Sequence, residues 1–182
     1  MSIPQEPRAA KLVVGLLMKD KELFGPLAEV LSKKLGLPDI VSAWFDFDYT
    51  GYYEQEMGGP LFRRMLAFKT LIPQDDLAGI KLITNAIEQD FQQNGNRRAN
   101  IDPGYLLSER FVLATGKNFA HRIYIGRNIY ADLTLIYRNG AFQTLPWTYP
   151  DYADSSMLTF LGRVRNKYVL DKKTPAHRSI VS

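Results

Sequence analysis

The 182-residue sequence contains no cysteine. This absence excludes disulfide bonds, thiolate metal sites and thiol nucleophiles, and it favours a cytosolic protein. The first residues also lack the basic segment followed by an apolar one that marks a signal peptide. The longest apolar run, residues 12–18, is far shorter than the ~20 residues of a membrane-spanning helix. We therefore expect a cytoplasmic protein with no membrane segment.

Basic residues are scarce in one part of the chain. None occurs between Leu35 and Phe62, a stretch that holds five carboxylates, whereas the segment from Ser155 onward is mainly basic. Over the whole chain, 23 Lys and Arg residues face 19 Asp and Glu residues, and this surplus is too small to indicate nucleic-acid binding. The chain thus has an acidic early segment and a basic end.

The length and composition indicate one globular domain, residues 1–182. Chains usually divide only when their length well exceeds about 150 to 250 residues. A composition of 46% hydrophobic and 12% aromatic residues excludes disordered, collagen-like and coiled-coil proteins. We expect flexible ends at residues 1–9 and 172–182.

The hydrophobic pattern predicts a core in the order β-α-β-β-α-β. The apolar run over residues 11–18 is typical of a strand covered on both faces. Helical spacing of apolar residues predicts helices at 22–35 and 75–92, and aromatic and β-branched residues predict strands at 39–47 and 62–72. A fourth strand is expected at 99–101 or, in preference, at 110–115. This order matches the split βαβ arrangement of ferredoxin-like folds.

Further elements extend this core. Alternating apolar residues predict strands at 121–125, 129–137 and 141–145, with Asn139-Gly140 as the turn of a hairpin. A last helix is expected from Ser155 or Ser156 to Leu170. We therefore predict an α+β fold, a ferredoxin-like core extended by an antiparallel hairpin and a C-terminal helix.

Five segments together resemble a known family: residues 49–58 (YTGYYEQEMG), 100–105 (NIDPGY), 113–118 (LATGKN), 121–124 (HRIY) and 145–152 (LPWTYPDY). The sequence is similar to an uncharacterised bacterial family of about this length, domain of unknown function 4416. The likeness covers nearly the whole chain. The family has no established activity, so the resemblance implies no catalytic residues.

Residues 44–56 combine six aromatic residues with four carboxylates. In a strand, Asp46 and Asp48 point to the same face, where two carboxylates can hold Mg²⁺ or Ca²⁺ or share a proton. Tyr49 and Tyr53 are then candidate ligand contacts. The alternative is a solvated strand face beside a tyrosine-rich loop that covers the core.

Two acidic residues stand beside prolines. Asp102 precedes Pro103, which predicts an extended or turn conformation with an outward side chain that can cap the backbone or serve as a catalytic carboxylate. Two prolines also flank the short segment that contains Trp147, and Asp151 follows the second of these prolines. This rigid segment suits either plugging one end of the sheet or stacking on a flat ligand, with Trp147 and Asp151 as ligand contacts.

Lys117, His121 and Arg122 form a compact basic cluster with an imidazole. Because His177 lies in the terminal tail, His121 is the candidate catalytic base, although it can equally hydrogen-bond a loop. Lys117 and Arg122 are candidate anion ligands. The phosphate-loop spacing Gly-x-x-x-x-Gly-Lys-Ser/Thr is absent around Gly116.

Three functions remain open. The preferred one is a protein with a ligand-binding pocket, with or without enzymatic activity. In it, Asp46 and Asp48 face the basic cluster around a small anionic ligand that is phosphorylated or nucleotide-like. A divalent cation such as Mg²⁺ is an optional cofactor. The second is a non-catalytic protein-interaction module. Exposed sheet edges would allow such a module to form a homodimer. RNA binding comes last, because the acidic aromatic segment repels phosphate.

Overall fold

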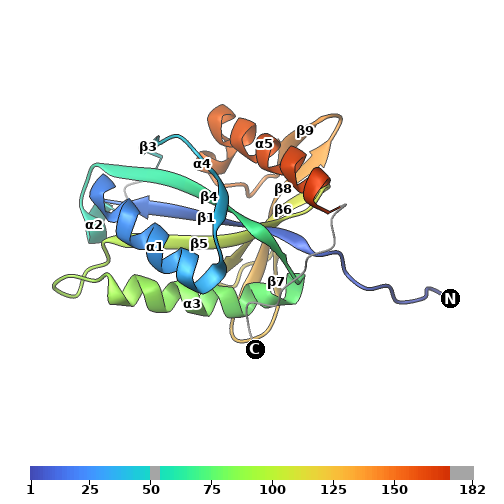
Figure 1. Cartoon of the computed structure of the whole chain (residues 1–182), viewed down its shortest axis with the longest axis horizontal. Coiled ribbons are helices and arrows are strands. Elements are labelled where there is room, and N and C mark those ends of the chain that lie inside the picture. The colour runs from blue at the N-terminus through green and yellow to red at the C-terminus, as the bar shows by residue number, and fades with distance from the viewer. Residues whose placement is uncertain (50–53, 173–182) are drawn as a thin grey trace.

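The computed structural model describes residues 1–49 and 54–172. Helices and strands alternate along the first half of the chain, and strands dominate the second half until a final long helix (Figure 1). In order, the elements are β1 (Ala10–Met18), the 3-10 helix η1 (Lys21–Leu23), α1 (Phe24–Leu35), β2 (Pro38–Val41), β3 (Phe45–Phe47), α2 (Glu54–Met57), β4 (Leu61–Ile72), the 3-10 helix η2 (Gln74–Asp76), α3 (Leu77–Asp90), β5 (Ala99–Leu106), β6 (Arg110–Thr115), β7 (Arg122–Tyr124), β8 (Tyr130–Arg138), β9 (Ala141–Thr144), α4 (Pro150–Ala153) and α5 (Ser155–Asp171).

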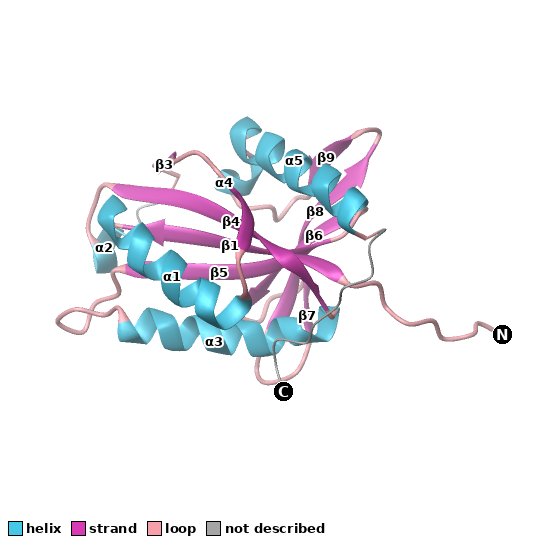
Figure 2. Ribbon diagram, in the orientation of Figure 1, coloured by secondary structure: helices cyan, strands magenta, loops and turns pink. Residues whose placement is uncertain are grey.

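The strands of the described residues form one large antiparallel sheet (Figure 2). Its order is β2-β4-β1-β5-β6-β8-β7, with β3 also paired to β4 and β9 also paired to β8. Helices pack against this sheet (Figure 2). The fold is therefore α+β, as predicted, and no helix in the described ranges is long and apolar enough to cross a membrane.

The first strand is the centre of the core. All residues of β1 are buried, so both of its faces are covered, as its continuous apolar run predicts. The helices α1 and α3 lie side by side against the sheet (Figure 1), and α1 presents Leu27, Leu31 and Leu35 to the core at a spacing of four residues. Gly15 leaves room for α4, because a Cβ there would stand 3.0 Å from the hydroxyl of Tyr152.

Several predicted boundaries need correction. The helices predicted at residues 22–35 and 75–92 each begin with a short 3-10 turn, and the strand predicted at residues 39–47 is divided into β2 and β3. The division falls at Ser42, whose hydroxyl accepts a hydrogen bond of 2.9 Å from the backbone N–H of Met65. A side chain thus takes part in the strand pairing at this point, and the ladder is interrupted.

Of the two conformations predicted for Asp102 before Pro103, extended or turn, the structure shows the extended one, because Asp102, Pro103 and Gly104 lie inside β5. Pro103 is tolerated since β5 pairs with β6 only from Gly104 onward, so its missing N–H breaks no ladder bond on that side. Gly104 is required because a Cβ there would overlap the carbonyl oxygen of Val112. The strand that follows α3 is therefore β5, which contains the less favoured alternative at residues 99–101, and the preferred alternative at residues 110–115 is the next strand, β6.

Candidate functional site

The sheet has a gap between β5 and β6, because these two strands pair along only part of their length. The two strands pair only from Gly104 to Leu106, so the first half of β5 has no strand on its outer side. The backbone of Ile101 bonds instead to α3: its N–H donates to Glu88 at 2.8 Å, and its carbonyl accepts from the ammonium of Lys81 at 2.8 Å. Two charged side chains of α3 thus replace a strand and form one wall of an opening.

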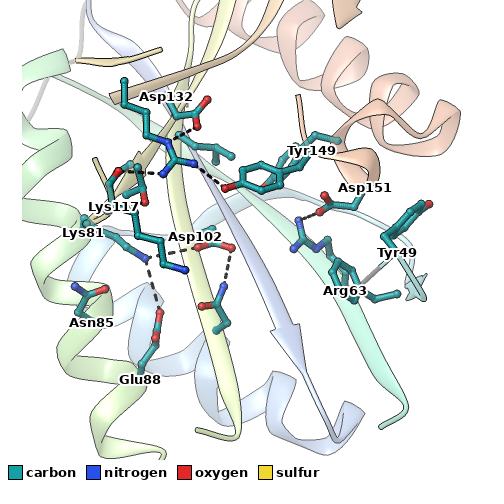
Figure 3. Close-up of a pocket in the computed structure, with 18 of the residues that line it drawn as sticks. Tyr49, Arg63, Lys81, Asn85, Glu88, Asp102, Lys117, Asp132, Tyr149 and Asp151 are labelled. Carbon is teal, nitrogen blue, oxygen red and sulfur yellow. Dashed lines mark hydrogen bonds and ion pairs between the residues drawn. The ribbon is translucent and has the colours of Figure 1, made fainter. Parts of the chain in front are cut away.

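A cavity of about 640 Å³ lies at this opening. Its walls come from α3, α4 and the segment that leads into it, and the strands β3 to β8, and its side chains are mainly charged or aromatic (Figure 3). The basic side chains that line it are Arg63, Lys81, Arg97, Lys117 and Arg122. The acidic ones are Glu88, Asp102, Asp132 and Asp151. With all groups ionised, the lining carries one net positive charge.

The first ionic group of the cavity surrounds Lys81. Its ammonium lies 3.8 Å from Glu88 and 3.6 Å from Asp102 (Figure 3), and Asn100 donates a hydrogen bond of 2.7 Å to Asp102. Arg97 extends the group, because it donates to both Glu88 and Asn100. Burial raises the pKa of Glu88 above its usual range, and the positive charge of Lys81 offsets only part of this effect. Glu88 is thus a carboxyl group that holds a proton more readily than an exposed one.

The second group pairs Arg63 with Asp151. Both side chains are buried and form an ion pair, and the guanidinium also packs over the rings of Phe47 and Tyr152. Burial raises the pKa of Asp151, while the charge of Arg63 lowers it and that of Asp102 raises it further. Asp151 is thus a second carboxyl group of the cavity that holds a proton more readily than an exposed one.

The third group is built around Asp132, a buried residue of β8. Arg122, its partner across β7 and β8, donates a hydrogen bond of 2.9 Å from Nε to Oδ2. The same guanidinium donates to the carbonyl of Lys117 at 3.0 Å and to the hydroxyl of Tyr149 at 2.7 Å. Arg122 therefore fastens three separate segments together at the rim of the cavity.

A second, smaller pocket of about 350 Å³ adjoins the cavity on the other side of Arg122. Lys117, Arg122 and Tyr149 line both spaces. In the smaller pocket the ring of His121 stacks on that of Trp147, with centroids 5.0 Å apart and planes at 12°. The Nε2 atom of His121 lies 3.3 Å from Asp132. The imidazole thus belongs to the aromatic pocket rather than to the ionic cavity.

The structure brings together part of the set of residues predicted from the sequence. Those that line the ionic cavity are Tyr49, Asp102, Lys117, Arg122 and Asp151, and those in the adjoining pocket are His121 and Trp147. Tyr53 lies outside the described residues.

The predicted acidic pair does not take part in either space. Asp46 and Asp48 are exposed and line neither the cavity nor the pocket. Asp46 lies in β3, whereas Asp48 follows the end of that strand. Within residues 1–49 and 54–172, no group of three or more His, Asp or Glu side chains is placed to hold a metal ion.

Sequence reasoning missed the charged residues of the sheet, of α3 and of the loop after α3, namely Arg63, Lys81, Glu88, Arg97 and Asp132. One signal was available, because Lys81 and Glu88 are seven residues apart and therefore share one face of α3. Both fall within a helix whose apolar side is buried. Charged residues two turns apart at the border of an apolar face predict a polar site under the helix.

The comparisons with known proteins identify a family but add no chemistry. The family model described as Domain of unknown function (DUF4416) matches residues 8–168. Comparison with curated proteins gives no match, and comparison with solved structures gives none either.

Proposed function

Because the chain belongs to the DUF4416 family, a domain of unknown function with no established activity, we propose its function from the cavity itself. The protein binds a small anionic ligand, phosphorylated or nucleotide-like, at the opening between β5 and β6. We place this activity in the cytosol, on the grounds that a chain without cysteine suits a reducing compartment.

The observation that carries the proposal is the charge of the cavity lining. Five basic side chains face four acidic ones, and burial raises the pKa of two of those four, Glu88 and Asp151. Protonation of either carboxyl group increases the positive charge that a ligand meets. The volume of about 640 Å³ lies in the range of small-molecule sites, about 300–1,000 Å³. A small phosphorylated compound with further polar groups therefore suits the cavity in both charge and size.

The carboxylates of the cavity also favour a ligand that has hydrogen-bond donors. Asp102, Asp151 and Glu88 accept hydrogen bonds when ionised, so they favour a ligand that also carries hydroxyl or amino groups. If the site is catalytic, Asp102 is the better candidate for proton transfer than His121, because Asp102 lines the ionic cavity whereas His121 lines only the adjoining pocket. A divalent cation remains an optional companion of the phosphate.

A thermal-shift screen with inorganic phosphate, sugar phosphates and mononucleotides tests the proposal. A ligand that binds the folded state raises the melting temperature by mass action. We expect at least one phosphorylated compound to do so, and Lys117→Ala to reduce the shift, since Lys117 lines both spaces. The matched control is Lys34→Ala, which removes an exposed lysine at the end of α1. Equal shifts in both variants, or no shift with any compound, would contradict the proposal.

A protein-interaction module is the second candidate, and one observation favours it. The edge strand β7 presents Ile123 and Tyr124 to solvent, and Phe119 beside it is also exposed. Exposed apolar side chains on a sheet edge are typical of interaction surfaces. A stable complex with a second copy, measured by sedimentation and lost in Ile123→Glu, would support this alternative.

For the architecture, we propose that the segment from β1 to β5 is a ferredoxin-like core. The order β2-β4-β1-β5 with antiparallel pairing throughout supports this assignment, because the two β-α-β units then interleave as in the split arrangement. RNA binding on such a sheet is disfavoured, because the complete burial of β1 leaves this central strand no open surface on which bases can stack.

A further inference from the structure

The aromatic pocket beside the ionic cavity has a construction of its own. Three rings meet there: His121 stacks on Trp147, and Phe119 lies at 5.4 Å from His121 with a tilt of 58°. Phe119 is 65% exposed and Trp147 36% exposed, so each of these two side chains keeps surface that a ligand can reach. A planar group can extend this stack.

Hydrogen bonds hold the segment that carries Trp147 in place. We call the three rings of Phe119, His121 and Trp147 the aromatic platform. The indole Nε1 of Trp147 donates a hydrogen bond of 2.8 Å to the carbonyl of Leu133. The next residue, Thr148, donates from its hydroxyl to the carbonyl of Thr134 at 2.6 Å and accepts from the N–H of Leu145 at 2.8 Å. The segment is therefore anchored to β8 before any ligand arrives, which lowers the entropic cost of binding.

The two spaces meet at shared residues. Lys117, Arg122 and Tyr149 line both, so a ligand whose charged part lies in the cavity reaches the rings with an aromatic part. A sugar phosphate without a base leaves the aromatic platform unused, whereas a nucleotide supplies both a phosphate and a stacking ring. We infer that the pocket formed by Phe119, His121 and Trp147 is the subsite for the heterocyclic base of a nucleotide ligand.

This inference rests on the proposed function and narrows it to one class of ligand. The base stacks on the aromatic platform beside Arg122, and the phosphate lies on the side of Lys117 that faces the cavity. Base stacking on protein rings tolerates different bases, so the subsite selects nucleotides over sugar phosphates rather than one nucleotide over another.

The test compares two probes that differ by the base alone, ribose 5-phosphate and adenosine 5′-monophosphate, by calorimetric titration of the full chain. We expect the nucleotide to bind at least about 5-fold more tightly. Phe119→Ala removes this preference and leaves the affinity for ribose 5-phosphate unchanged. The control Ile123→Ala removes an apolar side chain that is 69% exposed on neighbouring β7 and lines neither space, so it keeps the preference. Both substitutions affect exposed side chains, so neither variant is expected to unfold.

The outcomes separate the subsite from the proposed function. If wild type binds both probes equally, or if Phe119→Ala weakens both equally, the subsite is overturned while the anion-binding cavity stands. If neither probe binds, the subsite is overturned, whereas the anion-binding cavity is overturned only when inorganic phosphate, the other sugar phosphates and the other mononucleotides also fail to bind. Dimerisation of the wild type that Phe119→Ala abolishes would assign these rings to a second copy of the chain and would also overturn the subsite.

Discussion

The buried ammonium of Lys11, in the first strand, donates a hydrogen bond of 2.7 Å to Asp171, at the end of the last helix. It also donates to Asp39 of β2 at 2.6 Å, and Lys167 lies 3.4 Å from the same carboxylate. These four residues join both ends of the fold to the edge of the sheet. A buried lysine demands such partners, because an unpaired charge in the interior is strongly unfavourable.

This cluster predicts a pH-dependent loss of stability. Burial raises the pKa of Asp171, but hydrogen bonds from Lys11 and Lys167 outweigh this effect, and the pKa lies below its usual value. The stabilisation is therefore complete above the unfolded-state pKa of ~3.9 and is lost as the pH falls through the lower folded-state value. Asp171→Asn should lower the free energy of unfolding at pH 7 by about 2 kcal/mol.

Urea denaturation across the acidic range measures this difference. We expect the gap between wild type and Asp171→Asn to shrink once the pH is below the unfolded-state pKa of ~3.9. Asp90→Asn, at an exposed position at the end of α3, serves as the control and should follow wild type throughout. A gap that does not change with pH would mean that the ion cluster is not its source.

Two glycines predict opposite effects of the same substitution. Gly104→Ala places a methyl group against the carbonyl oxygen of Val112, where β5 meets β6, and should cost about 1–3 kcal/mol by overpacking. Gly162 lies inside α5, where an added Cβ would meet no atom within 4 Å, so Gly162→Ala should gain about 0.5–1 kcal/mol. Urea midpoints of both variants check the signs, and a neutral Gly104→Ala would refute the close approach of the two strands.

The elements predicted well are those specified by local pattern. The continuous apolar run of β1, the helical spacing in α1 and the Asn139-Gly140 turn, with φ angles of 51° and 83°, each depend on a few neighbouring residues. The preference for residues 110–115 over residues 99–101 as the next strand has the opposite origin. A Pro-Gly pair predicts a turn locally, but its place on a partly unpaired strand edge is decided by β6 and α3, which the local pattern does not contain.

The same distinction explains what was missed at the site. Asp102, Lys117, Arg122 and Asp151 stand beside prolines or glycines or in a compact cluster, and such positions attract notice in a sequence. Asp132 stands within an alternating strand and looks ordinary there. Its burial follows from its pairing with Arg122 across β7 and β8, a contact that only the assembled sheet creates.

The pair of Arg122 and Asp132 should therefore couple much more strongly than a surface pair. Their side chains are 7% and 3% exposed, and removal of either leaves a buried charge without its opposite. A double-mutant cycle of Arg122→Ala and Asp132→Ala should give a coupling energy of about 2 kcal/mol, measured by urea denaturation. Asp132→Asn replaces Asp132→Ala if the latter does not fold, with the same sign expected.

The matched control is the pair of Glu29 and Lys33, one turn apart on α1, whose side chains are 67% and 70% exposed. Solvent screens this pair, and ordering two long side chains opposes its attraction, so its coupling should be close to the error of the measurement. Added salt should reduce the coupling of the surface pair further and should affect that of Arg122 and Asp132 less, because buried charges are screened less. Equal couplings in the two cycles would show that Asp132 does not hold Arg122 in place, and the rim shared by the cavity and the aromatic pocket would then depend on Tyr149 and the backbone of Lys117.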